Sequence, residues 1–275
     1  MTICVSVKVS EGLVLAADST ASIQGWIGEP QKGPPSILKT YDHVRKLSHI
    51  KDYPIGTLTW GAALIGARSV ESLIKEYEYS LQSLEGNEND YTVQKIASGL
   101  LVHVKNFYDA EFANQPPAAR SPLGILVSGY SRKKFFPEQW LINLPVSDKL
   151  DAVRPDQNGK PEFGAHWFGL TDAIIRLHFG RDDATLGILA EHFKVTPDEI
   201  FQLLLKLQYP VIFDGMPLQD AIDYAVYLVN VVIGRFRFVV GAPLCSGEID
   251  VAVITPNEFT WIQRKCWHVT SALVR

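Results

Sequence analysis

The sequence predicts an α+β fold in which two sheets lie between layers of helices. Three observations predict it: short apolar runs joined by turns open the chain, two stretches with helical spacing follow, and strands return on either side of further helices. A layered architecture suits this order because it buries the apolar face of each element against another element. With 275 residues and 47% apolar content, the chain can build the core that such a fold needs.

The amino-terminal part of the chain is expected to contain strands followed by two helices. Apolar residues recur at helical spacing from Ser69, and a second amphipathic stretch begins at Val93. The segment 25–39 is rich in glycine and proline and is expected to be a loop, because those residues interrupt regular structure. The strand pairs are expected at 3–8 with 13–18 and at 44–50 with 55–60.

The rest of the chain is expected to alternate between strands and helices, with a polar surface loop at 147–160. Thr196 followed by Pro197 is a favourable helix start, because proline suits the first helical turn. Strands are expected at 123–130, 135–144, 163–169, 236–240, 249–254 and 258–262. Other helices are expected at 171–178, 184–193 and 218–233. No repeat or domain boundary is evident, so residues 1–275 are expected to form a single domain.

Composition and charge exclude several classes of function. A net charge of −4 and a pI of about 6.0 argue against a general binder of nucleic acid or of an anionic membrane surface. No apolar run approaches the ~20 residues that span a bilayer, and Lys8 and Glu11 interrupt what would be the apolar part of a signal peptide. Three scattered cysteines favour neither a disulfide framework nor a zinc site. We therefore expect a soluble, cytoplasmic protein without a metal or organic cofactor.

Thr2 is the residue with the clearest chemical potential. It directly follows Met1, and threonine is small enough for methionine aminopeptidase to expose it. A terminal amine beside its own hydroxyl can act as the base that makes this hydroxyl a nucleophile. An unperturbed α-amino group has a pKa of about 7.7–8.0, against about 10.4 for lysine, so part of it is already neutral near pH 7.

Three motifs, in order, resemble the opening of proteasome β-subunits and the related bacterial HslV peptidase. Thr2 followed by 12–19 (GLVLAADS) resembles the start of those proteins. Residues 45–50 (RKLSHI) resemble the basic strand that carries the family's catalytic lysine. Residues 55–63 (IGTLTWGAA) are similar to the family's glycine-rich turn, whose backbone N–H forms the oxyanion hole. The motifs lie within 1–80, whereas the remainder of the chain is similar mainly in the order of its elements.

The resemblance implies an N-terminal-nucleophile (Ntn) hydrolase with a four-layered αββα sandwich of two mainly antiparallel sheets between helical layers. The implied catalytic set is Thr2 as the nucleophile, Lys46 beside the terminal amine, and Asp18 paired with Lys46. A nearby ammonium lowers the pKa of the amine, and the ion pair keeps Lys46 charged and in place. The implied reaction is hydrolysis of an amide or peptide bond through an acyl-enzyme.

The resemblance also assigns residues that would bind substrate or support the nucleophile. Backbone N–H groups near Trp60 and Gly61 are expected to stabilise the oxyanion, an interaction often worth about 3 kcal/mol, and Ser22 is expected to bind substrate backbone. Trp60 replaces the first of two adjacent glycines in the family's turn, and its side chain is expected to crowd the pocket or redirect specificity. The family's supporting serine is matched at best by Thr171. The family's outer supporting aspartate has no counterpart here, because the matching segment, APLCSG, contains no aspartate. Ser246 in this segment is a partial substitute for it.

Each of these residues also has a plain structural explanation. Asp18 at a strand end could cap a turn, Lys46 could be a charge on an edge strand, and Ser22 could be a surface serine. Cys4 faces inward on its strand and is expected to be a buried apolar residue rather than a nucleophile.

The predicted function is therefore that of a threonine peptidase or amide hydrolase that uses Thr2 after removal of Met1. The resemblance implies a homo-oligomeric ring that acts on peptides or proteins, with the identity of any ATPase unfoldase left open. Two alternatives keep the fold: an inactive structural ring subunit, favoured by Trp60 and the missing aspartate, and an Ntn amidase for small molecules. Relative to the family, the insertions lie near 25–39, 147–160 and 182–213.

Overall fold

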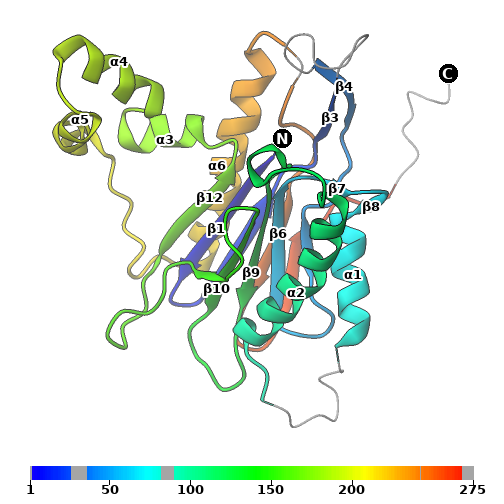
Figure 1. The fold of residues 1–275 in the computed structure, drawn as a ribbon. Helices are drawn as coiled ribbons and strands as arrows, with labels where there is room; N and C mark the ends of the chain where they lie inside the picture. The colour runs from blue at the N-terminus through cyan, green and yellow to red at the C-terminus, as the bar shows by residue number, and fades with distance from the viewer. Residues whose placement is uncertain (1, 26–35, 82–89, 242, 268–275) are drawn as a thin grey trace, which may run out of the picture.

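The computed structural model describes residues 2–25, 36–81, 90–241 and 243–267, and these form a mixed α+β fold built on two five-stranded sheets (Figure 1). Neighbouring strands within both sheets are antiparallel. The first sheet has the order β12 (Gly164–Gly169), β1 (Ile3–Val9), β2 (Gly12–Ala17), β13 (Asp250–Ile254) and β14 (Phe259–Gln263). The second sheet has the order β11 (Asp151–Ala152), β10 (Glu138–Leu144), β9 (Leu123–Gly129), β6 (Ile55–Gly61) and β5 (Leu47–His49).

The remaining described elements are two small strand pairs and a set of helices. The strand pairs are β3 (Ala21–Gly25) with β4 (Ser36–Tyr41) and β7 (Leu64–Ile65) with β8 (Arg68–Ser69). The α-helices are α1 (Val70–Ser80), α2 (Val93–Glu111), α3 (Asp172–Phe179), α4 (Asp183–Phe193), α5 (Pro197–Leu204) and α6 (Leu218–Phe238). Short 3₁₀ helices are η1 (Pro117–Ala119) and η2 (Leu205–Leu207).

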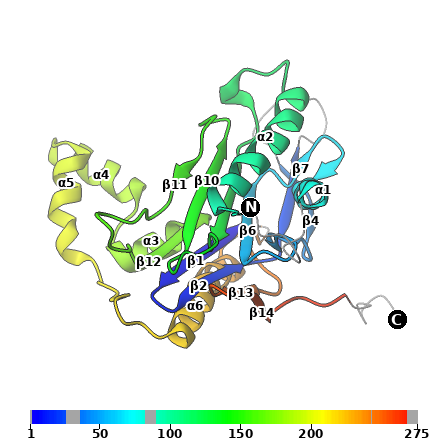
Figure 2. The same ribbon diagram turned by 90° about the horizontal axis from the view of Figure 1, so that it is seen from below.

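Three buried apolar clusters hold these elements together. In the first, α1 and α2 pack on β6, β9 and β10 of the second sheet. In the second, α6 and α3 pack on β1, β2 and β13 of the first sheet. The third contains residues of both sheets, so the two sheets also pack against each other. Figure 2 shows α2 beside the strands of one sheet and α6 beside those of the other.

Strand β1 is buried on both of its faces. Successive side chains of a strand point in opposite directions, so Val5 and Val7 join the cluster with α6 whereas Cys4 joins the cluster between the sheets. Cys4 is therefore buried, as its position predicts. Because β1 is enclosed in this way, the residue before it, Thr2, has a fixed place at the end of the first sheet.

The predicted starts of three helices are confirmed, and each has a side-chain cap. Ser69 Oγ accepts a hydrogen bond from the backbone N–H of Ser72 at the start of α1. The Thr92 hydroxyl accepts one from Lys95 in α2. Thr196 forms a capping box at the start of α5. Such caps satisfy N–H groups that have no partner within the first helical turn.

The predicted strand at 236–240 is wrong, because α6 continues through Phe238. Phe236 lies four residues after Val232, so both side chains fall on the helix face that packs on the first sheet. The aromatic and β-branched residues at this point favour a strand locally, but the continued burial of one helix face outweighs that preference.

Two predicted loops also contain strands. Residues 36–39 of the expected loop belong to β4, which pairs with β3, whereas 26–35 lie outside the described residues. The expected loop at 147–160 contains β11, whose residues pair with β10. In both places the partner strand supplies hydrogen bonds that a local reading of the sequence does not reveal.

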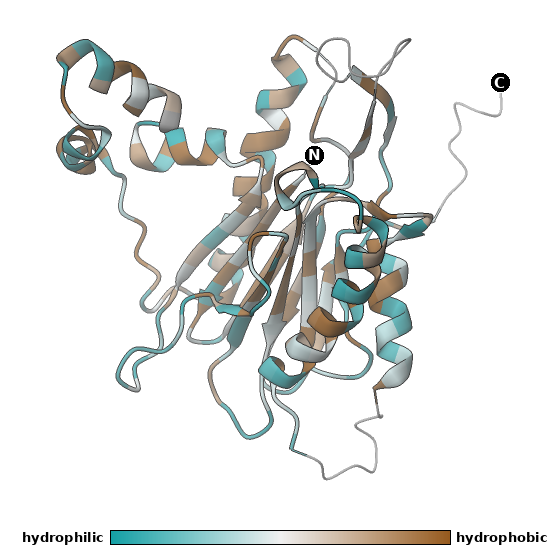
Figure 3. Ribbon diagram, viewed as in Figure 1, coloured by the Kyte–Doolittle hydropathy of each residue, from teal (hydrophilic) through white to brown (hydrophobic). Residues whose placement is uncertain are grey.

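Helices α4 and α5 pack against each other and extend away from the two sheets (Figure 1). Figure 3 shows hydrophobic stretches on α4, where Ile188 and Phe193 are 68% and 61% exposed. The predicted helices within 182–213 are thus confirmed as elements.

Within the described part of the chain, no helix is both long enough and apolar enough to cross a membrane.

The close contact between Gly124 and Trp60 yields a test of this packing. A Cβ at Gly124 would lie 2.1 Å from the Trp60 ring, so Gly124→Ala is expected to displace the indole and lower the free energy of unfolding by about 1–3 kcal/mol. Gly234→Ala is the matched control, because a Cβ there meets no atom within 4 Å and alanine favours a helix. Urea denaturation measures both variants; equal stability of the two would contradict the packing described here.

Candidate active site

Thr2 is held at the entrance of β1 by the loop that follows β12. Its carbonyl oxygen accepts a hydrogen bond of 2.7 Å from the backbone N–H of Leu170. Gly169 pairs with Ile3 and has a φ of +91°, and a Cβ at this glycine would lie 2.0 Å from the Thr2 oxygen. The loop can therefore approach Thr2 this closely only with glycine at position 169.

Asp18 follows β2 and is fully buried. One of its carboxylate oxygens, Oδ1, accepts hydrogen bonds from the backbone N–H of Ile3 at 3.0 Å and from Lys46 Nζ at 2.6 Å. The other oxygen accepts one from the backbone N–H of Thr20 at 3.1 Å. A single carboxylate thus joins the residue after Thr2 to the lysine that the sequence predicts beside it.

Lys46 lies just before β5 and is 4% exposed. Its carbonyl oxygen accepts a 2.9 Å hydrogen bond from the backbone N–H of Thr59 on β6, which fixes its main chain. The ion pair with Asp18 is buried, and a buried charge is costly unless it is paired and hydrogen-bonded. The structure therefore brings Lys46 and Asp18 together, and Asp18 also caps the turn that follows β2 through its bond to Thr20.

A cleft of about 770 Å³ opens above this ion pair. Thr2 and Lys46 line it together with Trp60, Gly61 and Ser22. The Thr2 hydroxyl makes no hydrogen bond to any described residue, and neither does the buried Ser22 hydroxyl. Two hydroxyl groups that have no hydrogen-bond partner among the described residues therefore lie in the wall of one cleft.

Gly61 turns the chain at the end of β6. Its φ is +84°, and a Cβ at this position would lie 2.2 Å from the Pro122 carbonyl oxygen. The backbone conformation and the close approach of Pro122 both require glycine here. The glycine at this turn therefore has a structural reason that is independent of any catalytic role.

Trp60 lines the cleft but is anchored between the sheets. Its indole stacks on Phe168 of β12, with ring centroids 4.2 Å apart and planes 14° apart. It also lies over Gly124, which has no side chain to displace it. The indole is therefore a fixed part of the cleft wall.

Neither Thr171 nor Ser246 makes a side-chain hydrogen bond to Thr2. Thr171 precedes α3, and its side chain makes no hydrogen bond to a described residue. The Ser246 hydroxyl lies 2.6 Å from that of Thr20 and donates to Asp42 at 3.3 Å. Ser246 thus supports the turn after Asp18 rather than the nucleophile.

Two residues near the ion pair are absent from the sequence-based set. The thiol of Cys245 is buried near Asp18, and burial together with the Asp18 charge raises the pKa of this thiol. His43 lines the cleft beside Lys46. Cys245 directly precedes Ser246 in the segment APLCSG, of which the sequence-based set includes Ser246 alone.

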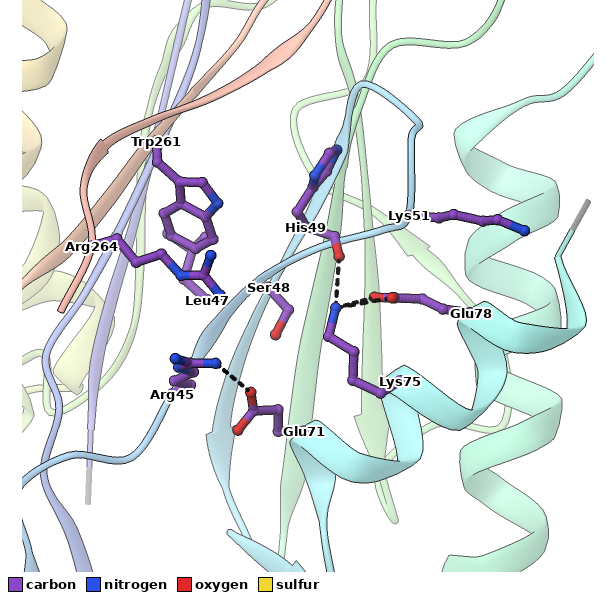
Figure 4. Close-up of a pocket in the computed structure, with 10 residues that line it drawn as sticks. All are labelled: Arg45, Leu47, Ser48, His49, Lys51, Glu71, Lys75, Glu78, Trp261 and Arg264. Atoms are coloured by element: carbon purple, nitrogen blue, oxygen red, sulfur yellow. Dashed lines mark hydrogen bonds and ion pairs between the residues drawn. The ribbon is translucent and has the colours of Figure 1, made fainter. Parts of the chain in front are cut away.

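A smaller cavity of about 200 Å³ lies beside β5, the strand that follows Lys46, and shares Arg45 and Glu71 with the cleft. Figure 4 shows Arg45 directed toward Glu71, with the closest charged atoms 3.7 Å apart. Trp261 of β14 and the nearby Arg264 also line this cavity. The carboxyl-terminal end of the described chain therefore lies close to the strand that follows Lys46.

Across the described residues, no group of three or more His, Cys, Asp or Glu side chains is placed to hold a metal ion.

The fold and the site together define an α+β chain whose first strand begins beside a buried lysine–aspartate pair. No family model and no curated protein sequence matches the chain. It is similar in structure to a Gly-1 mutant of Anbu from Hyphomicrobium sp. strain MC1, with a TM-score of 0.56, 14% identity, and 96% of this chain and 86% of that chain covered. It is also similar to Anbu (ancestral beta-subunit) from Yersinia bercovieri, with a TM-score of 0.51, 12% identity, and 94% and 86% covered.

These comparisons correct the family assignment made from the sequence. The motifs in 1–80 predict membership of the proteasome β-subunit and HslV family, and this prediction is wrong as stated, because no family model matches. The similarity reported above is to Anbu, and at 12–14% identity it shows a shared fold alone. Short motifs around strand ends can indicate a fold, but they do not identify the family, because one fold is shared by many proteins.

The buried ion pair leads to a stability prediction. Lys46→Met leaves the Asp18 charge buried without its partner and is expected to lower the free energy of unfolding by about 3–5 kcal/mol. The double variant Lys46→Met/Asp18→Asn removes both charges and is expected to recover much of this loss. Urea denaturation of the three proteins measures the effect.

The control for this prediction is an exposed ion pair. Arg68 and Glu76 are 47% and 48% exposed, so Arg68→Met is expected to change stability by less than about 1 kcal/mol. If Lys46→Met were no more destabilising than Arg68→Met, the claim of a buried, uncompensated Asp18 charge would be wrong.

Proposed function

We propose that the chain is a threonine-type hydrolase of amide or peptide bonds, with Thr2 as its nucleophile after removal of Met1. One observation carries the proposal: Thr2 lines a cleft together with Lys46, and Asp18 binds both Lys46 and the backbone of Ile3. The fold shared with Anbu, an "ancestral beta-subunit" in one of the two structures, supports the same class of protein.

In the proposed reaction, the neutral Thr2 amine takes the proton of the Thr2 hydroxyl as the oxygen attacks the substrate carbonyl. The tetrahedral intermediate collapses as the ammonium returns this proton to the leaving amine, whose C–N bond breaks. A water molecule, deprotonated by the same amine, then hydrolyses the ester between Thr2 and the acyl group. The free hydroxyl is regenerated, so no other reactant is consumed.

The charge of Lys46 is what makes the amine a useful base in this proposal. A cation near an ammonium favours its neutral form and so lowers the pKa of the amine. Asp18 holds the Lys46 side chain in place, and Asp18 is itself held by two backbone N–H groups. Of the two charged residues, it is therefore Lys46 that lines the cleft.

The other cleft residues fit a peptide substrate. We propose that backbone N–H groups at Trp60 and Gly61 stabilise the oxyanion, and that the unpartnered Ser22 hydroxyl binds substrate backbone. The stack of Trp60 on Phe168 closes one wall of the cleft, which limits the side chains that can bind there.

We further propose a single domain with a four-layered αββα arrangement that assembles into a homo-oligomeric ring. Support comes from the three apolar clusters, which place helices on each sheet and the sheets on one another. The exposed apolar residues of α4 and α5 are surfaces that packing against another subunit would bury. An inactive ring subunit is the second candidate, because neither Thr171 nor Ser246 makes a side-chain hydrogen bond to Thr2.

The test is the intact mass of untagged protein before and after incubation with a peptide epoxyketone. This reagent bonds to a hydroxyl and a free amine on one residue, so we expect loss of Met1 and the addition of a single inhibitor. Thr2→Ser is expected to retain the adduct. Thr2→Ala is expected to lose it, although Met1 is still removed, because alanine is as acceptable as threonine to the aminopeptidase.

Other outcomes separate the candidates. Retained Met1 without an adduct would contradict the hydrolase proposal and favour the inactive subunit. Loss of Met1 without an adduct would contradict the peptidase proposal and favour an amidase for small molecules.

A further inference from the structure

Lys265 is a buried lysine that the proposed reaction does not use. It follows β14 and is 6% exposed. Its ammonium donates to Asp250 at 2.7 Å, to the Ser19 hydroxyl at 2.8 Å and to the Val44 carbonyl oxygen at 2.9 Å. A lysine ammonium has three N–H donors, so each donor has one acceptor.

Two of these acceptors belong to the segments that carry the proposed catalytic pair. Ser19 directly follows Asp18, and Val44 lies two residues before Lys46. The backbone N–H of Val44 already donates to the Ser19 carbonyl oxygen at 2.9 Å. Lys265 therefore binds both segments at the point where they meet.

Asp250 holds the Lys265 ammonium at this point. It lies in β13 opposite Ala17, the last residue of β2, and is itself buried. It also accepts a 2.9 Å hydrogen bond from the backbone N–H of Lys265, so it binds this residue twice. Burial lowers the pKa of Lys265 and its bonds to Asp250 oppose this shift, so Asp250 helps to keep the ammonium charged.

The residues on either side of Lys265 also lie against the segment that contains Lys46. The Arg45 guanidinium lies over the ring of Trp267, 5.1 Å from its centroid. Arg264 and Trp261 line the cavity that Arg45 also lines (Figure 4). The chain from 261 to 267 thus contacts the Lys46 segment at several points, of which Lys265 is the buried one.

We propose that Lys265 is a positioning residue that fixes Asp18 and Lys46 relative to each other, and that the catalytic effect of this contact rests on the proposed function. Asp250 satisfies one of the three N–H donors of Lys265, and the other two need acceptors from elsewhere in the protein. Those acceptors are Ser19 and Val44, so a small shift of either segment would move one member of the pair.

Amide hydrogen exchange tests the positioning without reference to activity. In Lys265→Met, exchange of the Val44 and Thr20 amides is expected to rise about tenfold or more, because these amides join the two segments and bind Asp18. Lys8→Met is the matched control. Lys8 is also a buried lysine in an ion pair, but it lies at the other end of β1.

The control variant is expected to leave both amides unchanged. The amides of β9 serve as an internal reference for global loss of stability. If the Val44 and Thr20 amides were no faster in Lys265→Met than in Lys8→Met, the positioning proposal would be overturned.

Kinetics then test whether position affects the reaction. Lys265→Met is expected to lower kcat about 10- to 100-fold while KM changes little, because displaced catalytic groups slow the chemical step more than binding. Lys265→Met/Asp250→Asn removes both charges, so its stability is expected to recover while kcat stays low. Recovery of kcat along with stability would show that Lys265 is only one half of a structural ion pair.

If Lys265→Met does not fold, Ser19→Ala is the variant that tests the proposal instead. It removes one acceptor of the lysine and keeps both charges, and a smaller fall in kcat with faster Val44 exchange is expected. If wild-type protein forms no epoxyketone adduct, the proposed function fails, and the exchange data alone still decide whether Lys265 positions the pair.

Discussion

The buried carboxylate of Asp18 is the interaction on which the rest of the site depends. It binds the backbone of Ile3, the backbone of Thr20 and the ammonium of Lys46. The buried Cys245 thiol, from a distant part of the sequence, lies close enough for the Asp18 charge to raise its pKa. An unpaired buried carboxylate is strongly unfavourable, so these donors must stay in place for the folded state to be stable, and the stability of the fold and the geometry of the site have one common cause.

The packing of the two sheets makes this interaction possible. Asp18 ends a strand of the first sheet, whereas Lys46 leads into a strand of the second. The cluster between the sheets sets their separation, and within it Cys4 donates its thiol hydrogen to the Thr59 carbonyl oxygen across the interface. Thr59 in turn fixes the main chain of Lys46. The depth of the cleft and the contact between the charged residues are therefore both consequences of how the sheets pack.

The sequence could reveal the parts of this site that depend on local pattern. Thr2, Asp18 and Lys46 are singled out by short motifs that resemble the opening of proteasome β-subunits and HslV, and the structure brings Asp18 and Lys46 into contact. Thr171 is matched to the supporting serine by the resemblance alone, and the printed contact with Thr2 is a backbone hydrogen bond from its neighbour Leu170, which no side-chain pattern could indicate. No local sequence pattern indicates the role of Lys265, because its hydrogen bond to Ser19 joins residues 246 positions apart. The strand predicted at 236–240 failed for a related reason: burial against the first sheet, a tertiary effect, extends α6.

The charges around Asp18 also bear on how a terminal amine could act as a base here. Asp18 and Asp250 are matched by Lys46 and Lys265, so this buried group is electrically balanced as it stands. A protonated amine at Thr2 would add a further positive charge beside the cleft without an additional carboxylate to compensate it. Nearby cations and partial burial both favour the neutral form of such an amine. The balance of the two buried pairs thus gives a physical reason for Thr2 to carry the proton acceptor of the proposed reaction, without a histidine.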